Sequence, residues 1–223
     1  MSSTLYTLRG RSPETKSMGD RFFAWAREHR AQLGLGLGLA VLAGAFAALI
    51  AVNRGRLADR GADQLTMARM QLSAGRQKEA LQILDDVIAG NRVNPVGLQA
   101  TIIKGDLLTT TGKHADASAL YEEAYTRTTN AAYKPLLLAG MAASAVEMKM
   151  YAEAIRHYEA LVTAYPEHLL TPRAYMELGR LHRALNASEE SRKAYEKVVA
   201  LYPKSLWAAE AQSEMGVVPA AGK

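Results

Sequence analysis

The sequence predicts an all-α protein with one N-terminal transmembrane helix, an α-solenoid of about four helical hairpins and a C-terminal capping helix. Residues 33–52 form a stretch without a charged side chain. Behind this stretch, columns of similar residues recur with a period of 37 residues. Residues that favour helix ends recur at the same period in the middle of each unit, which indicates a helix, a tight turn and a second helix per unit.

Residues 1–30 are predicted to form a basic cytoplasmic tail. This segment holds six Lys or Arg residues and three Asp or Glu residues, so it carries +3 of the chain's net charge of +5. Three aromatic residues, Phe22, Phe23 and Trp25, stand among arginines just before the uncharged stretch. Aromatic rings and cationic side chains both favour the headgroup region of a bilayer, so we expect this part of the tail to lie on a membrane surface.

Residues 31–53 are predicted to form the transmembrane helix. The uncharged core from Leu33 to Val52 would be about 30 Å long as a helix, which matches the hydrocarbon thickness of a bilayer. The alternative is a signal peptide that is cleaved near the small residues of "AFA" at 45–47. A long apolar core, a leader of about 30 residues and the arginines at 54, 56 and 60 favour a retained helix.

Small residues recur at four-residue spacing within this helix. They are Gly34 and Gly38 in one set, and Ala40, Gly44 and Ala48 in another. Such spacing lets two membrane helices approach backbone to backbone, so these residues are predicted to pack against a second copy or against a membrane partner. The alternative is that Gly and Ala are simply common in membrane helices.

The flanking charges predict the orientation of this helix. Five Lys or Arg residues lie within about 20 positions on its N-terminal side and four on its C-terminal side, which is a slight positive-inside bias. Long domains translocate largely regardless of their charge, so the charges of the short N-terminal tail count more in setting the orientation of the helix. We therefore expect the N-terminus in the cytoplasm and the domain that follows on the other side of the membrane.

Residues 54–216 are predicted to form the repeat domain, with units that start near residues 61, 98, 135 and 172. Each unit has two small residues, a large residue four positions after the second of them, and a further apolar residue three positions later. The columns are Ala68, Gly105, Ala142 and Gly179; Ala80, Ala117, Ala154 and Ser191; Leu84, Tyr121, Tyr158 and Tyr195; Val87, Ala124, Leu161 and Val198; and the turn column Gly75, Gly112, Lys149 and Asn186. Small residues allow the two helices of a hairpin to pack closely, and the large residue fills the space beyond.

These columns resemble the tetratricopeptide repeat, a 34-residue helical hairpin with small residues, an aromatic residue and a late proline at fixed positions. The third and fourth units match best, since Tyr158 is followed by Pro166 and Tyr195 by Pro203. The first two units have Arg92 and Thr129 in place of the proline, and the period is three residues longer than that of the family. We expect the extra residues in the loops between units. A generic helical bundle with accidental periodicity is the alternative.

Local signals agree with this register. Asn94-Pro95 and Thr171-Pro172 are each predicted as an N-cap followed by proline in the first helical turn. The segment "SLWAAEAQSEM" at 205–215 is predicted to form the capping helix, with Trp207 over the last hairpin, and residues 217–223 are predicted to form a flexible tail.

The candidate partner-binding residues lie on the inner face, which is the surface formed by the first helices of the units. At the fifth position of each unit stand Leu65, Ile102, Ala139 and Met176, and at the ninth stand Arg69, Asp106, Ala143 and Arg180. This mostly apolar lining predicts binding of proteins or apolar peptide segments through Leu65, Arg69, Ile102, Asp106, Met176 and Arg180, with Arg69 or Arg180 placing a polar end. The alternative is that the stripe is core, covered by the chain's own terminal helices.

The sequence offers no sign of catalysis. It has no cysteine, so thiolate nucleophiles, cysteine metal sites and lipid-modified cysteines are excluded. HExxH, glycine-rich phosphate-loop and GxSxG motifs do not occur. Neither an enzyme, a cofactor nor a metal site is expected. The repeat domain carries only +2, without a basic and aromatic cluster, so no nucleic-acid partner is expected.

The whole layout resembles the ancillary subunit family of the bacterial SecYEG translocon. The shared features are a short charged tail with the pair Phe22-Phe23, one Gly-rich span and a tetratricopeptide-like domain. The resemblance implies a scaffold in the bacterial inner membrane, with a periplasmic repeat domain that links the translocon to periplasmic chaperones or emerging chains. Two alternatives remain, namely a receptor or assembly factor that faces the cytosol, and a soluble secreted protein released near Ala47.

Overall fold

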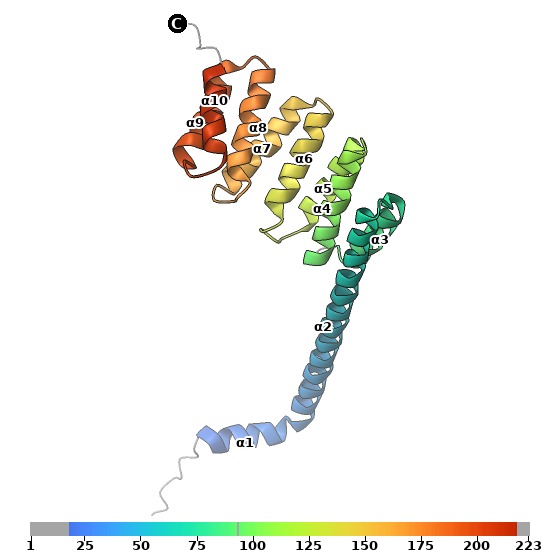
Figure 1. The fold of residues 1–223 in the computed structure, drawn as a ribbon. Coiled ribbons are helices and arrows are strands. Elements are labelled where there is room, and N and C mark those ends of the chain that lie inside the picture. The colour runs from blue at the N-terminus through green and yellow to red at the C-terminus, as the bar shows by residue number, and fades with distance from the viewer. Residues whose placement is uncertain (1–17, 93, 218–223) are drawn as a thin grey trace, which may run out of the picture. The chain divides into compact units, whose positions relative to one another are not determined.

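The computed structural model describes residues 18–92 and 94–217 of the chain, and these residues are helical wherever they form regular secondary structure (Figure 1). The predicted basic tail up to residue 17 and the predicted flexible tail from residue 218 lie outside the described residues. The chain divides into two compact units, Met1–Arg54 and Gly55–Lys223. Within the described ranges no strand is present, as the sequence predicts for a solenoid of helical hairpins.

The first unit contains α1 (Met18–Glu28) and the beginning of α2 (Arg30–Ser73). In α1 the rings of Trp25 and His29 stack with their centroids 5.0 Å apart. In the part of α2 that belongs to this unit, the described apolar side chains are exposed; Leu35 and Phe46, for example, are 68% and 65% exposed. In the described part of the chain, α2 is the one helix that is long and apolar enough to cross a membrane.

The second unit contains the repeats (Figure 1). The end of α2 and α3 (Gln77–Gly90) form the first hairpin, α4 (Pro95–Thr110) and α5 (His114–Arg127) the second, α6 (Lys134–Glu147) and α7 (Tyr151–Ala164) the third, and α8 (Thr171–Ala184) and α9 (Ser188–Leu201) the fourth. Each hairpin from α3 onward packs against the next, and α10 (Trp207–Val217) packs on α9 and α8. The predicted capping helix is therefore present at the end of the solenoid.

Four tight turns of one design join the two helices of each hairpin. Gly75, Gly112, Lys149 and Asn186 all have left-handed backbones, with φ of +75°, +78°, +57° and +58°. In every turn the next residue donates its N–H to the carbonyl five positions earlier, from Arg76 to Gln71 in the first unit and from Met150 to Ala145 in the third, each at 2.8 Å. This bond is the hallmark of the Schellman motif, so the turn column is confirmed even at Lys149.

Small residues and tyrosines interlock in the core. An added Cβ at Gly105 would lie 2.2 Å from Cζ of Tyr121, and one at Gly179 would lie 2.3 Å from Cε1 of Tyr195. Gly140 of the next hairpin also contacts Tyr121, at 2.6 Å from Cε2 for an added Cβ. The tyrosines thus fill the space that the glycines leave, both within a hairpin and between hairpins.

One of the two predicted N-caps is confirmed. Asn94 caps α4, and its side-chain oxygen accepts from the N–H of Gly97 at 3.0 Å. The prediction for Thr171 is wrong, because Leu170 is the N-cap of α8 and Thr171 is the first helical residue. The Thr171 hydroxyl instead donates to the carbonyl of Tyr165 at 2.6 Å, which ties the start of α8 to the end of α7.

The buried side chains form two clusters. The larger runs through the second to fourth hairpins into α10, from Leu98 to Ala211. The smaller joins Leu65 and Ala68 of α2 to Leu84 and Val87 of α3 and Ala100 of α4. No hairpin buries its apolar face alone. The packing of neighbouring hairpins therefore fixes the first helices of the units, which form the inner face.

Candidate protein-binding site

A cavity of about 310 Å³ opens on the inner face between α4, α6 and α8. It is lined by Ile102, Asp106, Tyr121, Leu136, Ala139, Gly140, Ala143, Tyr158, Leu161, Leu170, Arg173 and Ala174. Its volume lies at the lower end of the range of about 300–1,000 Å³ that is usual for ligand pockets. The cavity therefore has room for one or two side chains of a partner.

The cavity exists because α6 has small side chains where neighbouring units have large ones. Ala139, Gly140 and Ala143 stand on α6, whereas Met176 and Arg180 occupy the positions of Ala139 and Ala143 one period later on α8. The missing side-chain volume on α6 leaves the space, and the mostly apolar walls favour an apolar group in it.

Asp106 lines the α4 side of the cavity and is held there by Tyr121. The Tyr121 hydroxyl donates to Oδ1 of Asp106 at 2.8 Å, and the tyrosine ring packs on Gly105 and Gly140. Burial, with a further contribution from the Asp106 charge, raises the pKa of Tyr121 far above its usual value. The hydroxyl thus remains a neutral donor, and the Asp106 side chain points in a fixed direction.

Tyr158 of α7 contributes a second hydroxyl to the cavity. Its side chain is only 7% exposed, and its hydroxyl has no hydrogen-bond partner within residues 18–92 and 94–217. Burial raises the pKa of Tyr158 to about 12; nearby Glu177 acts in the same direction, while Arg173 and Arg180 oppose it. This neutral hydroxyl is available to a ligand.

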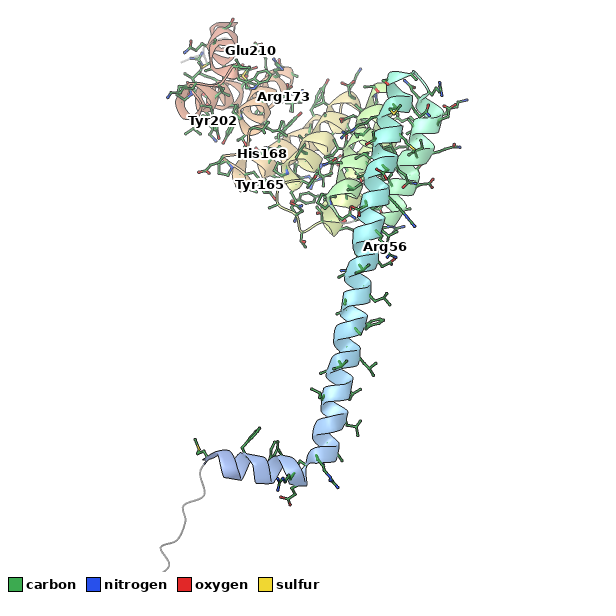
Figure 2. The ribbon with its side chains drawn as sticks, turned by 60° about the horizontal axis from the view of Figure 1, so that its bottom comes forward. Arg56, Tyr165, His168, Arg173, Tyr202 and Glu210 are labelled. Carbon is green, nitrogen blue, oxygen red and sulfur yellow. The ribbon has the colours of Figure 1, made fainter. Side chains whose placement is uncertain are left out.

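Arg173 contributes a positive charge from the first turn of α8 (Figure 2). Its guanidinium is exposed and forms no ion pair with any other described residue. Two other α8 arginines are occupied, since Arg180 pairs with Glu177 and Glu210, and Arg183 pairs with Glu214. The cavity therefore has a carboxylate from α4 and an unpaired guanidinium from α8.

The predicted partner-binding residues have different environments in the structure. Ile102 and Asp106 line the cavity, together with Ala139 and Ala143 of the same predicted stripe. Arg69 is exposed on α2. Leu65 is 5% exposed and Met176 is fully buried, so neither side chain offers a surface to a partner.

The burial of Met176 has a clear physical reason. It belongs to the buried cluster that includes Ala211 of the capping helix, and the same helix engages Arg180 through Glu210. At this end α10 packs on α8, the helix that contains Met176 and Arg180, while the α4–α6–α8 cavity stays open.

Several cavity residues escaped the sequence prediction, among them Tyr121, Tyr158, Leu136, Leu170 and Arg173. The two tyrosines lie in the repeat column of large residues, but the column indicates packing and does not reveal which hydroxyl faces a cavity. Arg173 has no charged counterpart one period earlier, where Leu136 stands. Repeat analysis offers no signal for such a residue.

The small residues predicted to pack the transmembrane helix are all exposed on α2. They are Gly34, Gly38, Ala40, Gly44 and Ala48. No atom lies within 4 Å of a Cβ built at any of the three glycines. Among the described residues there is also no group of three or more His, Asp or Glu side chains placed to hold a metal ion.

Two family models, both described as tetratricopeptide repeat, match this chain. One covers residues 65–133 and the other residues 133–204, so together they span more than half of the sequence. A comparison with curated proteins found no match.

Solved structures of tetratricopeptide-like proteins are similar to this chain. One is a tetratricopeptide repeat protein from Parabacteroides merdae, with 19% identity and a TM-score of 0.58 over 70% of this chain and 58% of that protein. Another is MamA from Desulfovibrio magneticus, with 20% identity and a TM-score of 0.55 over 72% and 84% of the two chains. A putative kinesin light chain with nearly identical repeats from Podosopora anserina has 21% identity and a TM-score of 0.58 over 72% and 86%. At these identities the likeness establishes a common fold but no shared function or partner. The chain spans less than two thirds of the length of the Parabacteroides protein.

Proposed function

Since the chain belongs to the tetratricopeptide repeat family, whose domains bind proteins or peptides, we propose that it is a membrane-anchored scaffold that binds a partner protein in the α4–α6–α8 cavity. The cavity is the observation that carries this proposal. On the inner face it combines apolar walls, a fixed carboxylate, and a hydroxyl and a guanidinium that have no partner among the described residues. We propose a non-catalytic role, because these groups serve recognition.

The membrane anchor is proposed from the first part of α2. An exposed apolar helix of this length is stable in a bilayer, where its side chains replace contacts with water by contacts with lipid. Arg54, Arg56 and Arg60 follow the uncharged stretch and would lie at the membrane boundary. Anchoring raises the local concentration of the repeat domain near other membrane proteins, which strengthens weak contacts without new interactions.

The partner system that we favour is the Sec translocon of a bacterial inner membrane. This part of the proposal is supported by the likeness in layout to the ancillary translocon subunits. On this hypothesis the tail is cytoplasmic, the repeat domain is periplasmic, and the cavity receives a segment of a periplasmic chaperone or of an emerging chain. Gly34, Gly38, Ala40, Gly44 and Ala48 would then contact a membrane partner or a second copy.

A crosslinking experiment tests the binding site. A photoreactive benzoylphenylalanine replaces Ala139 in the full-length chain, and illuminated cells are analysed for covalent adducts by mass spectrometry. We expect an adduct with a translocon component, a periplasmic chaperone or a secreted chain. The control is the same substitution at Ala89, which is exposed on α3 away from the cavity. Equal adducts from both positions, or none from Ala139, would contradict the proposed function.

A labelling experiment tests the orientation, since the chain has no cysteine of its own. Ser3→Cys and Ala221→Cys are made singly, and intact cells are treated with a membrane-impermeant maleimide. Labelling at position 221 alone, on a full-length membrane-bound chain, is the expected result. Labelling at position 3 alone would instead favour a cytosol-facing receptor, and a shortened soluble chain would favour a secreted repeat protein.

A further inference from the structure

The charges in the cavity restrict which partner segment fits it. Oδ1 of Asp106 accepts the Tyr121 hydroxyl, while the second carboxylate oxygen has no partner among the described residues. Arg173 and the Tyr158 hydroxyl supply donors from α8 and α7. Between these groups lie the small residues of α6. One end of the cavity is thus an acceptor of hydrogen bonds, and the other is a donor.

The Tyr158 hydroxyl is a hydrogen-bond donor that is open to a ligand in the cavity. The equivalent hydroxyl of Tyr121 donates to Asp106, whereas that of Tyr195 is buried without a hydrogen-bond partner among the described residues. The Tyr158 hydroxyl also has no partner in the described part of the chain, but it is not buried like that of Tyr195, although the Tyr158 side chain as a whole is only 7% exposed and lines the cavity. A ligand atom that accepts this hydrogen bond would satisfy it.

From this arrangement we propose that the bound segment presents an apolar side chain between two opposite charges: a Lys or Arg that contacts Asp106, and an Asp or Glu that contacts Arg173 and the Tyr158 hydroxyl. The inference rests on the proposed function, because it assumes that a protein segment occupies the cavity. An all-acidic segment is repelled by Asp106 and an all-basic one by Arg173, so the pair selects against both.

The three polar groups allow substitutions that keep the fold. Asp106→Asn retains an oxygen that accepts from the Tyr121 hydroxyl. Arg173→Gln replaces a guanidinium that forms no ion pair with any described residue by a neutral amide. Tyr158→Phe removes only the hydroxyl. Two controls remove one negative and one positive charge outside the cavity. They are Asp86→Asn and Lys78→Gln, both at exposed positions on α3.

The test is a selection from a displayed random-peptide library on the immobilised full-length chain in detergent. With the unchanged chain, we expect enrichment of peptides in which an apolar residue stands between a basic and an acidic one. Arg173→Gln and Tyr158→Phe are expected to weaken the preference for the acidic residue only, and Asp106→Asn the preference for the basic one. For a selected peptide, each loss corresponds to a Kd that is about 1.4- to 5-fold higher, as for partly exposed charge pairs. The two control variants are expected to leave enrichment and Kd unchanged.

Two results would overturn the inference in different ways. If peptides are enriched through the cavity but their charges are the same for all variants, the charge rule is wrong and the proposed function stands. If no peptide is enriched and Ala139 gives no crosslinked adduct, the proposed function fails together with the inference.

Discussion

At the scale of single residues, the fold depends on glycines that face tyrosine rings. Gly105 and Gly140 enclose the ring of Tyr121 between the second and third hairpins, and Gly179 contacts the ring of Tyr195. The hydroxyl of Tyr121 in turn orients Asp106 at the cavity. Packing in the core and geometry on the inner face are therefore linked through one side chain.

Gly105→Ala is predicted to destabilise the repeat domain. Its Cβ would lie 2.2 Å from Cζ of Tyr121, so the ring must shift, and overpacking of this kind costs about 1–3 kcal/mol. Thermal unfolding followed by circular dichroism measures the change. The control is Gly90→Ala in α3, where no atom lies within 4 Å of the added Cβ and the gain in helix propensity makes the variant equally or more stable. Equal unfolding temperatures for the two variants would contradict this packing.

At the scale of elements, the four Schellman turns set the register of the hairpins. Three of them have Gly or Asn at the left-handed position, and the third unit has Lys149 at φ +57°. A side chain other than Gly or Asn strains this conformation, because Cβ approaches the following carbonyl oxygen.

Lys149→Gly is predicted to stabilise the domain by about 1 kcal/mol, since it relieves this strain. Gly112→Lys, the reverse change in the preceding unit, is predicted to destabilise it by a similar amount. Denaturant unfolding of both variants provides the measurement. As a control, Glu147→Gly near the end of α6 places glycine at an exposed helical position, where about 1 kcal/mol of stability is lost. A destabilised Lys149→Gly variant would show that the lysine side chain has a role beyond the turn.

The docking of α10 depends in part on ion pairs to α8. Glu214 is the partner of Arg183 and is the more buried of the two glutamates involved. Glu214→Gln is predicted to raise the rate of amide hydrogen exchange in α10 several-fold while α4 to α7 keep their protection, because among the described helices α10 packs mainly on α8 and α9. Unchanged exchange in α10 would mean that apolar packing alone holds the helix.

Much of this architecture can be predicted from the sequence, because residue types that recur at each period indicate packing contacts that are repeated in every unit. The turn column predicted even Lys149, and the small and large columns predicted the glycine–tyrosine contacts. The cavity was only partly predictable, since it depends on what differs between units. Ile102 and Asp106 lie where the columns place them, whereas Met176 is fully buried, and Arg173 follows no period. The prediction of Thr171 as an N-cap was wrong because its hydroxyl donates to the carbonyl of Tyr165 instead.

At the scale of the whole molecule, buried tyrosines make the stability of the repeat domain sensitive to alkaline pH. Burial raises the pKa of Tyr121, Tyr158 and Tyr195 above the usual value near 10, and that of Tyr158 to about 12. The unfolded chain therefore loses these protons first. The stabilisation that they give is complete below pH 10 and is lost as pH rises through the folded-state pKa values.

Unfolding temperature measured between pH 8 and pH 12 is predicted to stay level up to pH 10 and to fall above it. Tyr158 alone contributes about 2–3 kcal/mol to this loss, from the difference between a pKa of 10 and one of about 12. Tyr158→Phe should therefore flatten the fall. A curve for Tyr158→Phe with the same slope as the unchanged chain would contradict the assigned burial.

A partner protein is proposed to occupy the cavity between α4, α6 and α8. The most direct test of this claim is to fill that cavity and measure what co-purifies with the full-length chain. Ala143→Trp places an indole in the cavity from an exposed position on α6, and Ala89→Trp adds the same group to α3 as the control. We predict that the partner is lost with Ala143→Trp, at unchanged unfolding temperature, and retained with Ala89→Trp. Equal recovery of the partner with both variants would contradict the claim.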